Sequence, residues 1–488
     1  MITPRATAAA YRLMHAGSIA LAEAETAGIH VDMERLCANE EYAQNKINRI
    51  DAHLRTEEWS DIWPRWRKIH GDGANLGSGA QLATVLFGDP CRGGMGLDPL
   101  KHTDTGAIAT DEDALAEYAQ NNKWLRGWIV RNKLEKIIGT YIKNIKAESC
   151  EHVDLVTGLN LRLLHPRNAL HTTDTYRSSV SSPSFQNMPV RDRRFAWLIR
   201  NAIRPRPGRR LIEIDFAGAE VRVAAGYHND PTMLKYLAGG GDMHWDVVER
   251  LFFVKRSPAI KGFRDAIKGR FTFAEFYGDY YKSVAESIWT WIRRESPVLE
   301  DGTLLRDHLA ANGITEYGNP LDKEHRKHEW LHHVQAVEHH FWKVRFVVYD
   351  KWRQDLYEEY CAVGEIVTKT GFHSCRPMSR NVLINNPIQG SSFHCLLWAF
   401  IHLHRNMERR RAPANLVAQI HDSIFADVAD SFVPEYCGVA RDIIETRLRR
   451  RMDWLTPGMV AEVKRSDVYE DGGSWDEMNV VKWEALVA

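Results

Sequence analysis

Residues 211–215 read LIEID, and residues 415–428 read NLVAQIHDSIFADV. The first segment consists mainly of branched apolar residues and ends in a carboxylate, which predicts a strand with an aspartate at its end. The second segment predicts two short strands, Leu416–Ile420 and Ile424–Val428, joined by a tight turn that carries Asp422. This pattern predicts a hairpin with an acid at its tip.

Two aspartates, Asp215 and Asp422, are therefore expected at strand ends. Hard divalent cations prefer oxygen ligands, and one or two carboxylates can hold them beside substrate phosphates. Two such ions about 3.5 to 4 Å apart stabilise both the attacking and the leaving oxygen of an in-line displacement. An isolated acid at a strand end is more often a turn cap, so neither aspartate alone establishes a metal site.

A third segment, residues 264–281, reads RDAIKGRFTFAEFYGDYY. Arg264 and Lys268 are four residues apart and share one face of a helix, where two cations suit a triphosphate. Phe273 and Tyr277 repeat that spacing and offer rings on which a base can stack. A solvated face for the cations and a core position for the rings are the simpler explanations of each pair taken alone.

Composition and charge exclude several classes of protein. The 488 residues are enough for two or more subdomains. The sequence shows no apolar run long enough to cross a bilayer and no signal-peptide pattern at Met1, so we expect neither a membrane protein nor a secreted one. Seven scattered cysteines without a Cys-x-x-Cys pair argue against a disulfide framework, so we expect a cytoplasmic protein. Eight arginines within residues 191–210 form a basic run that suits a phosphate backbone, although a solvated surface explains it equally well.

The N-terminal part of the chain has helical periodicity. Apolar residues recur every three to four positions up to Gly28, and Asp32 is expected to cap the next helix. A glycine-rich connection covers about 70–110, and helix is expected again from Thr110 to Lys143. These features predict an elongated helical lobe, which ends near residue 155 where the residue composition changes.

Taken in order, these segments resemble the polymerase core of family A DNA polymerases. DFAGAEVR (215–222) is similar to the first palm motif, residues 264–278 to the fingers helix, and QIHDS (419–423) to the second palm motif. Other matching segments are TYRSSVSSPSFQNMPVR (175–191), GDMHWDVVERLF (241–252), NNPIQGSS (385–392) and three thumb-like stretches at 79–88, 106–119 and 128–145. The resemblance spans nearly the whole chain and is weakest from about 283 to 370.

The resemblance implies an α/β (α+β) right-hand polymerase fold, with an antiparallel palm sheet, a helical thumb and helical fingers. We expect the N-terminal helices and thumb in residues 1–155 and the first part of the palm, with one metal aspartate, in 156–250. The fingers with an insertion are expected in 251–370, and the second part of the palm with the catalytic hairpin in 371–488.

The resemblance also implies a template-directed DNA-dependent DNA polymerase that extends a primer 5′ to 3′. Its ligands would be primer–template DNA and deoxynucleoside triphosphates, and two Mg²⁺ ions, with Mn²⁺ as the alternative, would be held by Asp215, Asp422 and the Phe216 carbonyl. Glu220 matches the residue that crowds the sugar 2′ position. The matching nucleotide contacts are Glu220, His244, Arg264, Lys268, Phe273 and Tyr277, and the matching DNA contacts are Arg177, Gln186, Asn187, Asn385, Gln389 and His421.

The sequence departs from the family pattern in several places. Ser423 stands where the hairpin usually carries a glutamate, and we expect activity to survive because both aspartates remain. The spacing from Lys268 to Tyr277 is one residue longer than usual, which predicts a helical bulge or a rotated aromatic face. It leaves open which of Thr272, Phe273 and Phe276 lies nearest the nucleotide. Asn381 replaces a common arginine, which puts one primer contact in doubt.

The thumb-like pattern starts close to Met1, so we expect no proofreading exonuclease in this chain and no 3′–5′ removal of mispaired ends. The acidic triplet that starts at Asp32 is interpreted as a helix start rather than as an exonuclease site. A separately encoded exonuclease or a processivity factor is an expected kind of partner. The role is expected in viral or bacterial replication or repair, in the cytoplasm of a bacterium or a phage-infected host.

Two other functions fit parts of the sequence. His328, Glu329 and His332 match the H-E-x-x-H pattern of zinc metallopeptidases, which needs both imidazoles on one helical face, but the surrounding segment is rich in histidine and accidental matches are common there. A single-subunit RNA polymerase shares the right-hand fold, and Glu220 argues against it because a ribonucleotide needs space beside its 2′ hydroxyl. A catalytically silent DNA-binding relative is disfavoured by the retained acids and cations.

Overall fold

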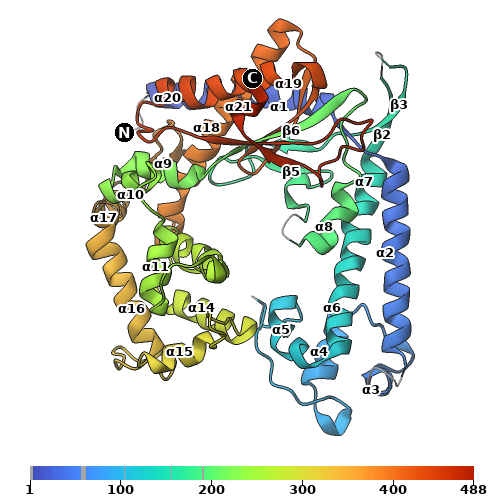
Figure 1. The fold of residues 1–488 in the computed structure, drawn as a ribbon, viewed down its shortest axis with the longest axis vertical. Coiled ribbons are helices and arrows are strands. Elements are labelled where there is room, and N and C mark those ends of the chain that lie inside the picture. Colours follow the sequence, from blue (N-terminus) through green and yellow to red (C-terminus); the bar gives the residue numbers. More distant parts are fainter. Residues whose placement is uncertain (1–3, 57–61, 104, 155–156, 190–191, 488) are drawn as a thin grey trace.

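The structure is a computed structural model that describes residues 4–56, 62–103, 105–154, 157–189 and 192–487. A five-stranded sheet lies at one end of the molecule, in the order β12-β11-β6-β10-β9, and every neighbouring pair is antiparallel (Figure 1). Its strands are β6 (Arg209–Phe216), β9 (Ala414–Ile420), β10 (Ser423–Ala429), β11 (Ala461–Arg465) and β12 (Asn479–Val481). The predicted strand at LIEID and the predicted hairpin are both confirmed.

Helices cover both faces of this sheet. Ile212, Ile214 and Ile424 belong to one large core, which also contains residues of α1 (Pro4–Ala27) and α18 (Arg380–Arg410). Leu211 and Phe425 point to the other face and pack in a second core with α8 (Arg193–Arg200). The alternation along β6 sends successive side chains to opposite faces, as a strand requires. The sheet is therefore a layer that is packed against a hydrophobic core on each face.

A thumb column of helices leaves the sheet on one side. Its members are α2 (Met33–Leu54), α3 (Ile62–His70), α4 (Gly79–Phe87), α5 (Glu112–Asn121), α6 (Lys123–Lys136), a π-helical turn (Ile137–Ile142) and α7 (Lys143–Glu148). Asp32 caps α2 as predicted, because its Oδ1 accepts from the Arg35 amide at 3.0 Å. The same carboxylate pairs with Arg204 at 3.2 Å, so this acid has a structural role.

A fingers column of helices leaves the sheet on the other side (Figure 1). Its members are α9 (Ala219–His228), α10 (Pro231–Leu237), α11 (Met243–Phe252), α12 (Lys261–Ile267), a π-helical turn (Lys268–Phe273), α13 (Ala274–Phe276), α14 (Tyr281–Glu295), α15 (Leu305–Ala311), α16 (Trp330–His340), a second π-helical turn (Phe341–Arg345) and α17 (Val347–Val363). This column shares its apolar core with α18 and one face of the sheet. The fold class expected from the resemblance is confirmed.

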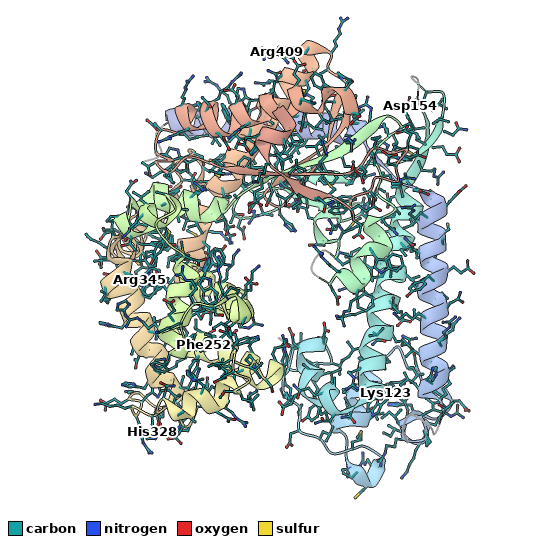
Figure 2. All side chains as sticks on the ribbon, viewed as in Figure 1. Lys123, Asp154, Phe252, His328, Arg345 and Arg409 are labelled. Carbon is teal, nitrogen blue, oxygen red and sulfur yellow. The ribbon has the colours of Figure 1, made fainter. Side chains whose placement is uncertain are left out.

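The two columns meet again at their far ends, where α5 contacts α14. Arg294 Nη1 lies 2.6 Å from Asp113 Oδ1, and Gln120 Nε2 donates to the Arg294 carbonyl. Both side chains of the ion pair are partly exposed, so the contact contributes little stability. The sheet and the two columns thus surround a space that the drawn side chains leave open in this view (Figure 2).

The remaining elements are short. They are β1 (Ile29–His30), β2 (Ser149–Val153), β3 (Asn160–Leu164), β4 (Arg167–Ala169), β5 (Ser179–Ser181), β7 (Ile366–Val367), β8 (His373–Ser374), α19 (Val433–Arg441), a π-helical turn (Asp442–Arg447), α20 (Leu448–Arg451), α21 (Trp483–Val487) and 3₁₀ turns at Gly71–Gly73, Pro90–Arg92, Phe185–Asn187, Pro258–Ile260 and Asp430–Phe432. Among the described residues, no helix combines the length and the apolar character needed to cross a bilayer.

Candidate active site at the end of the central strand

Asp215 and Asp422 lie side by side, although they are far apart in the sequence. In the β6–β10 ladder Asp215 is paired with Ser423, the residue next to Asp422. The Phe216 amide donates to the Asp422 carbonyl at 2.9 Å, so the hairpin turn is tied to the end of β6. His421 adopts a left-handed backbone with φ of +50°, which closes this turn. The backbone ladder thus holds the two carboxylates together.

Burial makes this pair of carboxylates electrostatically unfavourable. Desolvation raises the pKa of Asp215 to about 6, where Lys464 opposes the rise and Glu213, Asp422 and Glu462 add to it. Desolvation also raises the pKa of Asp422, against the opposing effect of Arg177. A divalent cation would offset both effects, and carboxylate oxygens are the ligands that Mg²⁺ prefers. The residues present therefore fit the metal that the resemblance implies.

Ser423, at the position of the missing glutamate, is a structural residue. Its side chain is 3% exposed, and its hydroxyl donates to the Ile420 carbonyl at 2.9 Å. The hydroxyl therefore closes the hairpin from within, and the two aspartates are the acids of the hairpin and β6 that remain available to a cation.

Arg177 connects the aspartates to the start of the fingers column. Its guanidinium lies 3.6 Å from Asp422 Oδ1 and 3.5 Å from Glu220 Oε1. Glu220 lies in the first turn of α9, which follows β6 through Gly218 at a left-handed φ of +61°, a backbone that favours glycine. Asp215 and Glu220 are thereby placed at opposite ends of one short turn.

The fingers helix places Phe273 and Tyr277 on the side of Glu220. The predicted bulge is present as the π-helical turn Lys268–Phe273, which absorbs the extra residue. Thr272 and Phe276 are buried in the core, whereas Phe273 and Tyr277 are half-buried and their rings stack with centroids 6.0 Å apart.

A narrow pocket lies between the aromatic pair and α9. Glu220, Phe273 and Tyr277 all line it, together with Tyr349, which sequence reasoning did not single out. The Tyr277 hydroxyl donates to Glu220 Oε2. Burial is the main cause that raises the pKa of Tyr277 above its usual range, and the neighbouring Glu220 carboxylate raises it further. Burial likewise raises the pKa of Glu220.

The cationic residues predicted to contact a triphosphate lie nearby on one face. Arg264 Nε pairs with Asp242 Oδ2 at 2.7 Å, and the exposed Lys268 places its Nζ 5.7 Å from the Phe273 ring. His244 lies 5.9 Å from that ring, its Nδ1 is buried without a hydrogen-bond partner among the described residues, and burial lowers the pKa of the ring to about 4. A neutral imidazole and the Lys268 cation thus lie beside one aromatic ring, and Arg264 lies near enough to His244 to help lower its pKa.

The residues predicted to contact DNA lie on several elements around the candidate active site. Gln186 Nε2 donates to Ser178 Oγ and Gln419 Oε1 at 3.1 and 3.2 Å, and Asn385 Nδ2 donates to the Tyr277 carbonyl at 3.0 Å. Asn187 is bonded to the Ser184 hydroxyl at 2.8 Å. Gln389 lies half-buried on α18, and His421 is exposed at the hairpin tip.

The strand β11 adds charges beside Asp215 that sequence reasoning missed. Glu462 pairs with Asp215 across the ladder, and Lys464 Nζ lies 3.0 Å from Glu213 Oε1. The sequence feature that could have identified this strand is the alternation of charged and apolar residues in AEVKR (461–465), which indicates a strand with one polar face.

The H-E-x-x-H interpretation is wrong in its geometry. The helix α16 begins at Trp330, so His328 and Glu329 precede it and His328 does not share a helical face with His332. Glu329 has a backbone in the extended region. The two imidazoles therefore lack the placement on one face that a zinc peptidase requires.

These features define a member of a known class of proteins. The model of the family "DNA polymerase family A" matches residues 45–460, and the chain belongs to this family. DNA polymerase I of Chloroflexus aurantiacus is 26% identical over 465 residues, which cover 94% of this chain and 42% of that protein. A DNA polymerase of Bacillus phage SP01 is 22% identical over 85% of this chain and 42% of its own length.

A solved structure has the same fold. The POL domain of Pol1 from M. smegmatis, in complex with DNA primer-template and dNTP, aligns with a TM-score of 0.69 over 95% of this chain and 70% of that one, at 19% identity. The chain spans less than half the length of the curated relatives it matches.

Proposed function

We propose that this chain is a template-directed DNA-dependent DNA polymerase that extends a primer 5′ to 3′ by a two-metal mechanism. The observation that carries the proposal is the meeting of Asp215 and Asp422 beside the cationic and aromatic face of the fingers column. When bound there, two Mg²⁺ ions supply stabilisation of the attacking and leaving oxygens. The ion ligands would be Asp215, Asp422 and the Phe216 carbonyl.

The other residues have supporting roles in this proposal. Arg264, Lys268 and His244 bind the triphosphate by donating hydrogen bonds and offsetting its charge, for which Arg264 exchanges its present partner Asp242. Phe273 and Tyr277 pack beside the nascent base pair. Glu220 closes the space beside the sugar 2′ position and is held there by the Tyr277 hydroxyl.

The DNA would lie in the space bounded by the two columns and the sheet. Arg177, Gln186, Asn187, Asn385, Gln389 and His421 would contact its primer or template strand. Contacts of this kind position DNA without selecting its sequence, so base selection rests on pairing within the closed pocket. The thumb would comprise residues 1–155, the palm 156–250 and 371–488, and the fingers 251–370. In this division α1 belongs to the thumb part although it packs on the sheet, and α9, α10 and most of α11 belong to the palm part although they stand in the fingers column.

Primer extension tests the proposal directly. With a primed template, we expect incorporation of deoxynucleotides only when Mg²⁺ or Mn²⁺ is present, and much slower incorporation of ribonucleotides. A preference for ribonucleotides would indicate an RNA polymerase, and DNA binding without any synthesis would indicate a silent relative. Relatives from bacteria and from a Bacillus phage support a site of action in the cytoplasm of such a cell.

A further inference from the structure

The segment between α15 and α16 forms a cluster of metal-ligand side chains far from the sheet. Glu316, His328 and Glu329 each offer a ligand atom, and these atoms all lie within 4.8 Å of one another. His328 is at the end of the fingers column that is remote from the sheet (Figure 2). The cluster is therefore separate from the aspartates of the candidate active site.

The backbone holds this cluster in place. The Thr315 amide donates to the His328 carbonyl at 3.0 Å, and the Trp330 amide donates to the Glu316 carbonyl at 2.8 Å. Gly318 has a φ of +91°, and a Cβ atom there would lie 2.7 Å from Glu329 Oε2. The chain thus turns tightly against the Glu329 carboxylate, in a way that only glycine permits.

A second observation points to a missing ligand. Glu329 is 6% exposed, and its Oε2 is buried without a hydrogen-bond partner among the described residues. His325 Nδ1 lies 3.5 Å from this oxygen and is also buried without a hydrogen bond among the described residues, and Arg326 Nε lies 3.9 Å from the other carboxylate oxygen, Oε1. Buried polar atoms are nearly always satisfied, so an ion bound by the Glu329 carboxylate would give this side chain the partner that it lacks.

We propose that Glu316, His328 and Glu329 bind one transition-metal ion, of which zinc suits the site best. Imidazole and carboxylate ligands together favour zinc over Mg²⁺, which prefers oxygen ligands alone. His325 acts as a positioning residue: its Nδ1 faces Glu329, and its Nε2 lies 3.3 Å from the Tyr281 hydroxyl. A water molecule completes the coordination.

Only a small movement is needed to admit the ion. His328 Nε2 now lies 2.5 Å from Glu316 Oε1, whereas two ligand atoms on a tetrahedral zinc are roughly 3.3 Å apart. Both side chains are about half exposed and are free to separate by less than about 1 Å, and the Glu329 ligand atom, which lies within 4.8 Å of the other two, takes up a similar separation from them. The segment from Asn312 to Glu329 contains no helix, and the bound ion would fix this segment to the start of α16.

The test is metal analysis of the full chain after loading with zinc and dialysis against a Mg²⁺ buffer. We expect one zinc per chain in the parent protein and at least tenfold lower occupancy in His328→Asn and in Glu329→Gln. His332→Asn and His339→Asn, altered in the same histidine-rich segment, are the matched controls and should keep their zinc. His325→Asn should weaken zinc binding by about 10- to 100-fold.

Equal loss in the control variants would show diffuse histidine binding and overturn the proposal, as would absence of retained zinc in the parent chain. Cobalt loading of the unaltered chain gives a readout that requires no variant, because one nitrogen and two carboxylate oxygens with water give the visible absorption of a four-coordinate ion. An octahedral spectrum would contradict the site. None of these readouts depends on polymerase activity, so the proposed function stands or falls separately.

Discussion

In the sheet, Asp215 and Asp422 are held by the backbone ladder of β6 and β10, whereas in the fingers column Phe273 and Tyr277 are held by side-chain packing around a π-helical turn. The ladder fixes its residues through hydrogen bonds that do not depend on side-chain identity. The fingers face depends on which side chains enter the core, here Thr272 and Phe276. Substitutions in the sheet should therefore remove chemistry without disturbing the fold, and substitutions in the fingers should alter how nucleotides fit.

The largest effect is expected from Asp422→Ala. Removing one of the two proposed metal-binding carboxylates should lower the primer-extension rate by about 10³-fold or more. DNA binding, measured by fluorescence anisotropy, should stay within about twofold of the parent because the hairpin backbone is unchanged.

Ser423→Ala is the matched control in the same hairpin. Its hydroxyl is bonded to the Ile420 carbonyl, so the variant should keep most of its activity and lose only about 1 kcal/mol of stability. Full activity of Asp422→Ala, or inactivity of Ser423→Ala, would contradict the distinction between the two side chains.

A smaller effect is expected in the fingers from Lys268→Ala. The loss of one cation should lower kcat/KM for deoxynucleotides by about 10- to 100-fold in steady-state extension assays. Lys261→Ala, an exposed lysine at the start of α12, is the control and should behave as the parent. Equal effects of the two substitutions would mean that the fingers act through general charge and not through a positioned contact.

The contact between the two regions is tested by Glu220→Ala. Opening the space beside the sugar should reduce the preference for deoxynucleotides over ribonucleotides by about tenfold or more, measured as the ratio of kcat/KM values. Tyr277→Phe keeps the ring but removes the hydroxyl that donates to Glu220, so it should give a smaller loss of preference. An unchanged preference in Glu220→Ala would remove this residue from sugar selection.

The smallest effect concerns the stability of the metal-free chain. The pKa of Asp215 is about 6 in the folded chain, above the usual value near 3.8, so the folded state holds this proton at a pH where the unfolded state has lost it. The contribution of Asp215 to stability should therefore fall by about 1 to 3 kcal/mol as the pH rises from about 4 to about 6, and should stay lower above that.

Asp215→Asn should lose activity and yet raise the melting temperature of the metal-free chain by a few degrees at pH 8, where the parent carboxylate is charged. At pH 4, where the parent carboxyl is protonated in the folded state, the two chains should differ much less. Thermal unfolding in a chelator at both pH values measures this. A variant that melts no higher than the parent at pH 8 would show that burial does not destabilise this carboxylate.

Local patterns predicted much of the fold. Branched apolar residues ending in an acid predicted β6, and the hairpin pattern predicted β9 and β10. Asp32 was predicted as a cap because an aspartate before a helix satisfies free amides. These features depend on near neighbours in the chain, which a single sequence displays directly.

The candidate site was predictable where residues lie close together in sequence or match a family motif, and less so elsewhere. Glu462 and Lys464 were missed because their relevance arises from pairing with β6, across more than two hundred residues. The H-E-x-x-H pattern was discounted from the histidine-rich segment around it, but its geometry was not predictable for the same reason. Whether His328 lies on a helix depends on where α16 begins, and contacts with the 315–317 segment decide that.

The sequence by itself determined the family, the strand that carries Asp215, the hairpin that carries Asp422 and the presence of an extra residue in the fingers helix. Only the tertiary structure decided that the extra residue is absorbed as a π-helical turn, that Tyr277 reaches Glu220, and that Glu316 meets His328. The physical reason is that local propensity sets what each segment forms, whereas burial of one apolar face against another sets which side chains remain at the surface to meet.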